Sequence, residues 1–237
     1  MKILAIKTRL FTAGDDLAVF IRAHVKKLPE KSVLVIASKI VALAESRTVK
    51  NLGSGQKEYA QLIRKESSAA KKTKYAWLTI TDGMLMANAG VDASNANGAL
   101  VLLPKDSFAS AAALRKALRR IYRVKKLGVV ISDSHVEPLR AGVVAHALGY
   151  AGIQGVRDYR GKKDLFDRTM KISRTNVADS LATAAALAMG EGAERQPIAL
   201  ITDAPVEFTE RINRNETRIA PRDDLYWPIL KNLKRRR

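Results

Sequence analysis

The chain has 237 residues, carries 42 Lys and Arg against 23 Asp and Glu, and has a formal net charge of +19. With 47% hydrophobic and 5% aromatic residues, it can bury the core of one or two compact, alanine-rich domains. The absence of cysteine excludes disulfides, thiolate zinc sites and a cysteine nucleophile. The positive charge favours polyanionic partners, which include nucleotides, anionic cofactors, RNA and acidic protein segments.

Membrane and export signals are absent from the sequence pattern. No apolar run reaches the length of about 18 residues expected of a membrane span. The chain also enters strand-like residues at once, without a signal-peptide pattern. We therefore expect a cytoplasmic protein that has no membrane partner.

Apolar periodicity predicts the elements of the first half of the chain. In order, they are a strand at 2–7, an amphipathic helix from Gly14-Asp15-Asp16 to Pro29, a buried strand at 32–37, a helix from Ser38, a loop at 51–55, a helix at 57–65, and strands at 75–81 and 99–103.

The second half predicts a helix at 107–123, a strand at 127–132, a strand and turn at 141–153, a helix at 176–189 and a strand at 197–202. Seven basic residues and no acidic residue lie between Arg115 and Lys126. This run is either a solvated helix face or a face that meets anions. No repeat or low-complexity linker marks a domain boundary.

The stretch from Met86 to Asn97, MANAGVDASNAN, combines small residues, a carboxylate and amides. Gly90 can adopt backbone angles closed to other residues, so a phosphate or metal-bound oxygen could approach the main chain. Asp92 supplies charge, and Asn95 supplies both donors and an acceptor. The alternative is a surface turn, for which this composition is equally typical.

Other polar groups follow predicted strands or helices. Ser38 and Lys39 stand at a strand-to-helix junction, where amides and a lysine can meet a phosphate, or where a helix simply starts with an exposed lysine. Asp133 and Ser134 end a buried strand, which gives a ligand rigid support. After the helix at 176–189, Gly190 lets the Glu191 carboxylate turn inward.

These segments resemble the coenzyme F-420:gamma-glutamyl ligase family, whose members carry a similar ANAGVD-x-SN stretch. Further matching segments follow in the family's order: SKIVALAE at 38–45, DS at 133–134, DYRGKKD at 158–164 and VADSLATAAALAMGE at 177–191. The resemblance runs from about Ile3 to Thr202. On its own residues, the DYRGKKD segment reads as a charged hairpin tip, whereas the resemblance puts it near an active cleft.

The resemblance implies an α+β fold with two interlocked α/β domains in an intertwined homodimer whose cleft is shared. It assigns residues 1–205 to the catalytic region and 206–237 to a basic C-terminal extension. We expect the cluster Lys234 to Arg237 to serve electrostatic localisation, because it lies beyond the family match.

The activity that the resemblance implies is GTP-dependent formation of an amide between L-glutamate and a carboxylate acceptor, through an acyl phosphate. No common phosphate-binding loop is present, and carboxylates from separate segments suit two Mg²⁺ or Mn²⁺ ions, with a monovalent cation beside them. The implied metal ligands are Asp92, Asp133, Ser134 and Glu191. The implied catalytic residues are Asp92, Asp133 and Arg140, and the nucleotide and substrate contacts are Ser38, Lys39, Asn95, Arg160 and Gly190.

Departures from the family pattern leave the acceptor open. Leu43, Asp82, Val136 and Glu137 stand where relatives tend to carry Lys, His, Gly and Arg. Three hypotheses follow: ligation of glutamate to an F-420 precursor or a folate, ligation to a protein such as a ribosomal protein, and a non-catalytic RNA- or anion-binding descendant of the fold.

Overall fold

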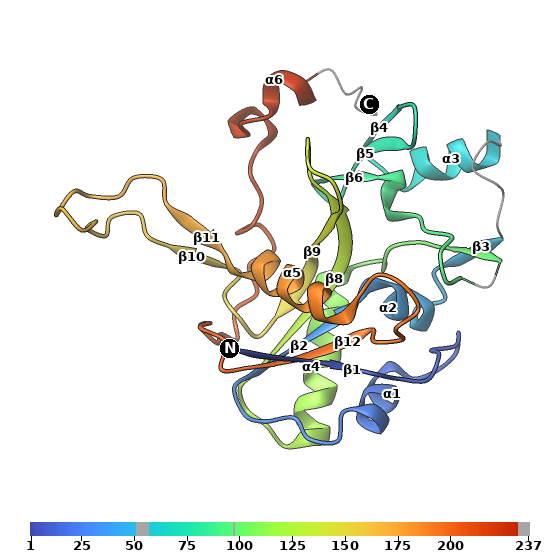
Figure 1. Ribbon diagram of the computed structural model, residues 1–237, viewed down its shortest axis with the longest axis horizontal. Helices are drawn as coiled ribbons and strands as arrows, with labels where there is room; N and C mark the ends of the chain where they lie inside the picture. The colour runs from blue at the N-terminus through green and yellow to red at the C-terminus, as the bar shows by residue number, and fades with distance from the viewer. Residues whose placement is uncertain (51–56, 97, 232–237) are drawn as a thin grey trace.

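A computed structural model describes residues 1–50, 57–96 and 98–231 (Figure 1). Its centre is a five-stranded sheet in the order β1-β12-β2-β8-β9. Only β2 and β8 pair in parallel; the other neighbours are antiparallel. The strands are β1 (Lys2–Ile6), β2 (Ser32–Ala37), β8 (Leu127–Val136), β9 (Val143–Ala151) and β12 (Ile198–Thr202).

Helices cover both faces of this sheet. Leu34 and Ile36 of β2 share one core with α1 (Leu17–His24), α2 (Ser38–Ala44) and α4 (Ser107–Tyr122), and Val33 and Val35 share another with α5 (Val177–Met189). A strand buried on both faces must be apolar throughout. This explains why β2 reads as one continuous apolar run.

A smaller unit is inserted between α2 and α4. It contains β3 (Thr48–Lys50), α3 (Lys57–Lys65), β4 (Ala69–Lys72), β5 (Trp77–Thr81), β6 (Met84–Ala87), the 3₁₀ turn η1 (Asn88–Gly90) and β7 (Ala99–Val101). β4, β5 and β6 form one sheet, and β3 pairs with β7. Tyr59, Ile63 and Trp77 build a separate core there.

Two segments lie outside these layers. The hairpin of β10 (Val156–Asp158) and β11 (Arg174–Asn176) carries a long charged loop and projects from the body as an arm (Figure 1). The C-terminal segment contains η2 (Pro221–Asp223) and α6 (Trp227–Leu230). The chain before these elements is tied to the main body through Glu216, whose carboxylate accepts hydrogen bonds from Tyr150 and the Gly155 amide.

The predicted core elements are confirmed, with several corrections. The first helix ends at His24 and not at Pro29, because Val25 is already extended (φ −92°, ψ 94°). β8 continues to Val136, so Asp133 lies within a strand and not at its end; the reason is that β9 keeps pairing with it, residue by residue. The strands β3, β4 and β6 were not predicted.

The basic run that begins in α4 is exposed at five of its seven basic residues, as a solvated face requires, and Arg115 is the buried exception. Arg115 is only 9% exposed. Its guanidinium donates to both carboxylate oxygens of Glu210, at 2.8 and 2.7 Å, and to the Leu127 carbonyl. This basic residue is therefore a buried bridge between α4 and the C-terminal segment.

Several of the predicted segments fall outside the residues that the structure describes. The loop at 51–55, Asn97 and the Lys234 to Arg237 cluster lie outside the described residues. The division of the chain at residue 205 stays a prediction. Within the part of the chain that the structure describes, no helix is long and apolar enough to cross a membrane.

Candidate functional site

The candidate site lies where β2 ends beside the parallel strand β8, which continues past it to Val136. Ala37 of β2 pairs with Ser132 of β8, so the residues that follow, Ser38 and Asp133, are brought together. The Ser38 hydroxyl donates to Asp133 Oδ1 at 2.6 Å. Ser38 is also the first residue of α2, which fixes the direction of its side chain.

Asp133 is a carboxyl group in unfavourable surroundings. Burial raises its pKa to about 6, against the lowering effect of the Ser38 hydrogen bond, and the negative charges of Asp92 and Glu191 raise it further. The charge effects put Asp92 and Glu191 within electrostatic range of Asp133, although the three carboxylates do not all lie within 4.8 Å of one another. Such a cluster gains stability when a cation joins it.

Lys39 and Asp92 form the second contact of the site. Lys39 Nζ lies 2.6 Å from Asp92 Oδ2, 2.7 Å from the Ser94 carbonyl oxygen and 2.9 Å from Ser94 Oγ. Burial works to raise the pKa of Asp92, but the hydrogen bonds from Lys39 and Ser94 leave it below its ordinary value. The lysine ammonium thus occupies a cradle of oxygen atoms.

The backbone before Asp92 is held in an uncommon conformation. Asn88 and Ala89 both have positive φ, 51° and 54°, which costs free energy for residues with a side chain. Hydrogen bonds fix them, because Thr79 Oγ1 accepts from the Ala89 amide and Asn88 Oδ1 from the Trp77 amide. A Cβ on Gly90 would lie 2.5 Å from the Leu103 side chain. The stretch is therefore a tightly packed support and not a loose surface turn.

Glu191 follows directly after the end of α5. Gly190 ends that helix with φ 78°, a conformation that favours glycine. Glu191 itself is exposed, yet it is near enough to raise the pKa of Asp133.

Four other described residues that were expected in the site make no hydrogen bond or ion pair with Asp92, Asp133 or Glu191. Ser134 is exposed and, because side chains alternate along a strand, points to the opposite face of β8 from Asp133. Arg140 and Asn95 are exposed. Arg160 lies on the arm and binds Asp158, with 2.6 Å between Nη2 and Oδ2. Arg160 belongs to the loop between β10 and β11, and this hairpin projects from the body (Figure 1).

The donor set fits a hard divalent cation. Asp92, Asp133, Glu191 and Ser94 offer only oxygen atoms, which suit Mg²⁺ or Mn²⁺. Lys39 already places a positive charge on Asp92 and Ser94. The sequence prediction missed Ser94, although its signal was present: a serine two residues after an aspartate commonly folds back on that carboxylate, and here its amide donates to Asp92 Oδ1 at 2.7 Å.

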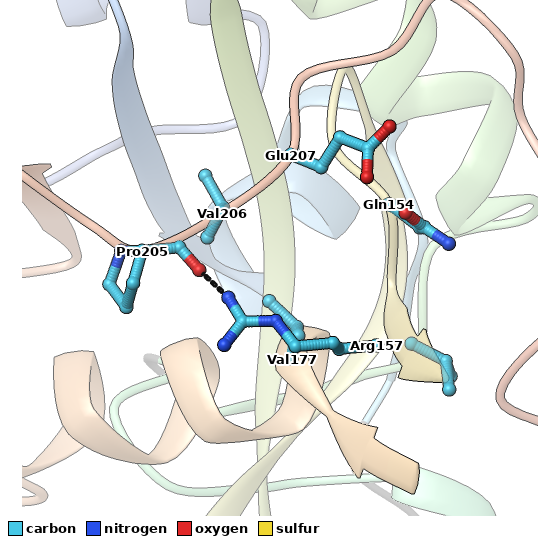
Figure 2. Close-up of a pocket in the computed structure, with 7 residues that line it drawn as sticks. Gln154, Arg157, Val177, Pro205, Val206 and Glu207 are labelled. Carbon is cyan, nitrogen blue, oxygen red and sulfur yellow. Dashed lines mark hydrogen bonds between the residues drawn. The ribbon is translucent and has the colours of Figure 1, made fainter. Parts of the chain in front are cut away.

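A pocket of about 280 Å³ lies elsewhere, at the beginning of α5 (Figure 2). The Arg157 guanidinium crosses it and donates to the Pro205 carbonyl. Since α5 has 13 residues, this pocket is separated from Gly190 by a helix about 20 Å long. It is not part of the carboxylate cluster. Its lining residues are Gln154, Val156, Arg157, Val177, Pro205, Val206 and Glu207.

The layered sheet and the inserted smaller unit define a mixed α/β protein, with a candidate site of oxygen donors and one lysine where β2 ends beside β8. The family described as F420-0:Gamma-glutamyl ligase matches residues 5–203. The chain belongs to this family.

Similar proteins carry the same assignment over most of their length. The chain is 33% identical to the coenzyme F420:L-glutamate ligase of Methanococcus maripaludis strain S2, covering 88% of this chain and 90% of that protein. It is 35% identical to the ligase of that name from Methanopyrus kandleri (79% and 80% covered) and 34% identical to that from Archaeoglobus fulgidus (81% and 83%).

Proposed function

We propose that the protein joins L-glutamate to a carboxylate acceptor in an amide bond, using GTP and divalent metal. The observation that carries this proposal is the pair of contacts Ser38–Asp133 and Lys39–Asp92 at the end of β2, within a family match over residues 5–203. The names of the relatives make an F420-type acceptor the first candidate.

The proposed reaction has two steps. The acceptor carboxylate attacks the γ-phosphate of GTP, which breaks the bond to GDP and forms an acyl phosphate. The α-amine of glutamate then attacks the acyl carbon, and inorganic phosphate leaves as the amide forms. Both steps bring anions together, so cationic groups must oppose their repulsion.

The residues of the cluster divide this task. Asp92, Asp133 and Glu191 would hold two Mg²⁺ or Mn²⁺ ions, which would neutralise phosphate oxygens; Ser134, expected to join them, points to the opposite face of β8 and would do so only if the strand end rearranged. A monovalent cation completes the proposed set. Lys39, which here pairs with Asp92 and Ser94, would be the cation that contacts phosphate if the Asp92 carboxylate were occupied by metal instead. Asn95, Gly190, Arg140 and Arg160 would position the nucleotide and the carboxylates.

The arm supports the proposal of an intertwined homodimer of two interlocked domains with a shared cleft. Leu165 and Phe166 near its tip are 97% and 77% exposed, an unfavourable state for large apolar side chains unless another surface covers them. A second copy is the partner we propose, since the arm could then carry Arg160 toward the neighbouring site.

The net charge of +19 favours a second candidate, in which the acceptor is a protein and the basic surface guides the enzyme to ribosomal RNA. A purely RNA- or anion-binding role accounts less well for three clustered carboxylates, because these repel anions when no metal is present.

One assay separates these functions. The protein, Mg²⁺ or Mn²⁺, GTP and labelled glutamate are incubated in parallel with an F420 precursor, a reduced folate and a cell lysate, with an Asp92→Asn variant as the control. We expect one product to gain the mass of a glutamyl unit, with release of phosphate, and the variant to give none. Label only in lysate protein favours the second candidate. No incorporation anywhere, despite bound GTP, rejects the ligase function.

A further inference from the structure

A cluster of nitrogen and oxygen donors lies beside the carboxylate site, on the hairpin of β8 and β9. Asp133 pairs directly with His146, and His135 pairs with Val144. Directly opposed residues of an antiparallel pair share a face, as do residues two apart on one strand. His135, Glu137 and His146 therefore project from the same face as Asp133.

The three side chains are in contact. His146 Nε2 lies 3.1 Å from Glu137 Oε1. The rings of His135 and His146 stack with their centroids 3.9 Å apart and 20° between their planes. One donor atom from each residue can be chosen so that all three lie within 4.8 Å of one another. Among the described residues, this is the only group of three His, Cys, Asp or Glu side chains with that spacing.

We propose that His135, Glu137 and His146 form a site for a divalent transition-metal ion of the zinc type, separate from the oxygen-only cluster. Two imidazoles and one carboxylate are a donor set that Zn²⁺ uses, and they leave a fourth position for water or a substrate oxygen. Mg²⁺ prefers oxygen donors and competes poorly for such a site.

The geometry needs only a small adjustment. Bonds of about 2.0–2.2 Å in a tetrahedron put donor atoms about 3.4 Å apart. The His146–Glu137 pair, at 3.1 Å, already has this separation. The His135 donor atom lies at most 4.8 Å from the other two, so it must approach them by no more than about 1.4 Å to reach tetrahedral spacing. Rotation of the His135 ring out of its stack provides this movement. The side chains of His146 and Glu137 are 25% and 41% exposed, which leaves them space to move.

The position of this site suggests a role for the ion in the proposed reaction, and this role, unlike metal binding itself, rests on the proposed function. Two residues along a strand span about 7 Å, so an ion on His135 lies next to Asp133. It would add positive charge at the edge of a site that must gather carboxylates and phosphates. Its fourth ligand position could accept a carboxylate oxygen of the acceptor or of glutamate.

The binding experiment needs neither nucleotide nor acceptor. The full chain is freed of metal with a chelator, and Zn²⁺ affinity is measured by competition with a chromophoric chelator; Co²⁺ then reports the ligand geometry through its visible absorption. We expect one Zn²⁺ per chain. The variants His135→Ala, Glu137→Gln and His146→Ala should each weaken binding by more than about tenfold.

Two controls make the result specific. The chain has three histidines, so His24→Gln is a matched control; His24 lies on α1, where its ring contacts the Phe20 carbonyl. Asp133→Asn tests whether the ion belongs to the carboxylate cluster instead. His24→Gln should keep the wild-type affinity, and Asp133→Asn should weaken binding by less than any of the three ligand variants. Loss of Zn²⁺ binding in Asp133→Asn with full retention in His146→Ala would overturn the proposal, and it would leave the ligase function intact.

A measurement on the wild-type chain covers the case of variants that fail to fold. In the ¹H–¹⁵N spectrum of the histidine rings, Zn²⁺ should shift two of the three imidazoles and leave the third unchanged. If no imidazole shifts, or if only His24 does, then the His146–Glu137 contact is a hydrogen bond without a metal function. A site confirmed in a protein without glutamate ligation would show that the two proposals fail separately.

Discussion

Asp133 illustrates how a single residue can oppose stability. Its carboxyl group is removed from water and faces two further acids, and both effects raise its pKa. Proteins tolerate such arrangements where function requires them. The unfavourable free energy of three like charges in a free protein becomes favourable binding free energy when a divalent cation joins them.

We predict that Asp133→Asn abolishes turnover and stabilises the metal-free protein. The folded-state pKa of about 6 lies above the ordinary 3.8, so the folded chain holds this proton over a range where the unfolded chain has lost it. Stability therefore falls as the pH rises through that window, and the full penalty remains above it. The variant lacks this fall, and its advantage should grow from near zero at pH 4 to at most about 3 kcal/mol at pH 7.

Urea unfolding in the presence of a chelator, at several pH values, measures this difference. Glu58→Gln is the matched control, because Glu58 is an exposed carboxylate on α3. If Asp133→Asn were equally stabilising at pH 4 and pH 7, the gain would not come from the carboxyl group's ionisation. If it were destabilising at both, the Ser38 hydrogen bond would matter more than the buried charge.

At the scale of elements, the sequence predicts a strand or helix correctly where the segment itself carries an apolar pattern or a capping residue. β2 and the first five residues of β8 are apolar runs, and α4 begins where Asp106 accepts from the Ala109 amide. β4, with the sequence AAKK, has no alternating pattern; it is a strand only because β5 pairs with it. The burial of Arg115 could not be predicted, because the partner that makes it possible, Glu210, is 95 residues away in the sequence.

The candidate site likewise has a part that the sequence predicts and a part that it does not. The junction that exposes Ser38 and Lys39 is readable from the apolar strand before it. The contacts that make it a site are not, because Ser38 meets Asp133 across 95 residues and Lys39 meets Asp92 across 53. Periodicity contains no information about such pairings, and only the resemblance grouped Asp92, Asp133 and Glu191 in advance.

The packing of α4 against β9 depends on a glycine. A Cβ at Gly149 would lie 2.4 Å from the Ser107 carbonyl carbon and 2.5 Å from the Phe108 nitrogen, and backbone atoms cannot move aside locally. We expect Gly149→Ala to destabilise the protein by about 1–3 kcal/mol, measured by urea unfolding. Gly192→Ala is the control, since its nearest contact is the flexible Glu194 carboxylate at 3.3 Å. Equal stability of the two variants would mean that α4 and β9 do not approach so closely.

At the scale of the whole molecule, the arm should control assembly. Light scattering after size exclusion should give the mass of a dimer for the wild-type chain. The double change of Leu165 and Phe166 to Asp should shift it toward monomer, because charged groups cannot be buried without partners. Tyr75→Asp changes a similarly exposed residue, 88% accessible on the β4–β5 turn, and should leave the mass unchanged. A monomeric wild type at all concentrations would contradict the proposed homodimer.

The excess of positive charge concerns the molecule as a whole, and its C-terminal cluster can be removed without touching the candidate site. Lys234 to Arg237 lie beyond residue 203, where the family match ends. Each basic residue that neutralises a phosphate releases a counterion, so deleting these four should lower affinity for single-stranded RNA and flatten its log–log salt slope by up to about 3. Glutamate ligation to a small acceptor at low salt should be unchanged, because that chemistry depends on the cluster around Asp92 and Asp133. Parallel RNA titrations at several salt concentrations and the glutamate assay test both statements. Loss of ligation with unaltered RNA binding would place the cluster in the catalytic machinery and refute its role in electrostatic localisation.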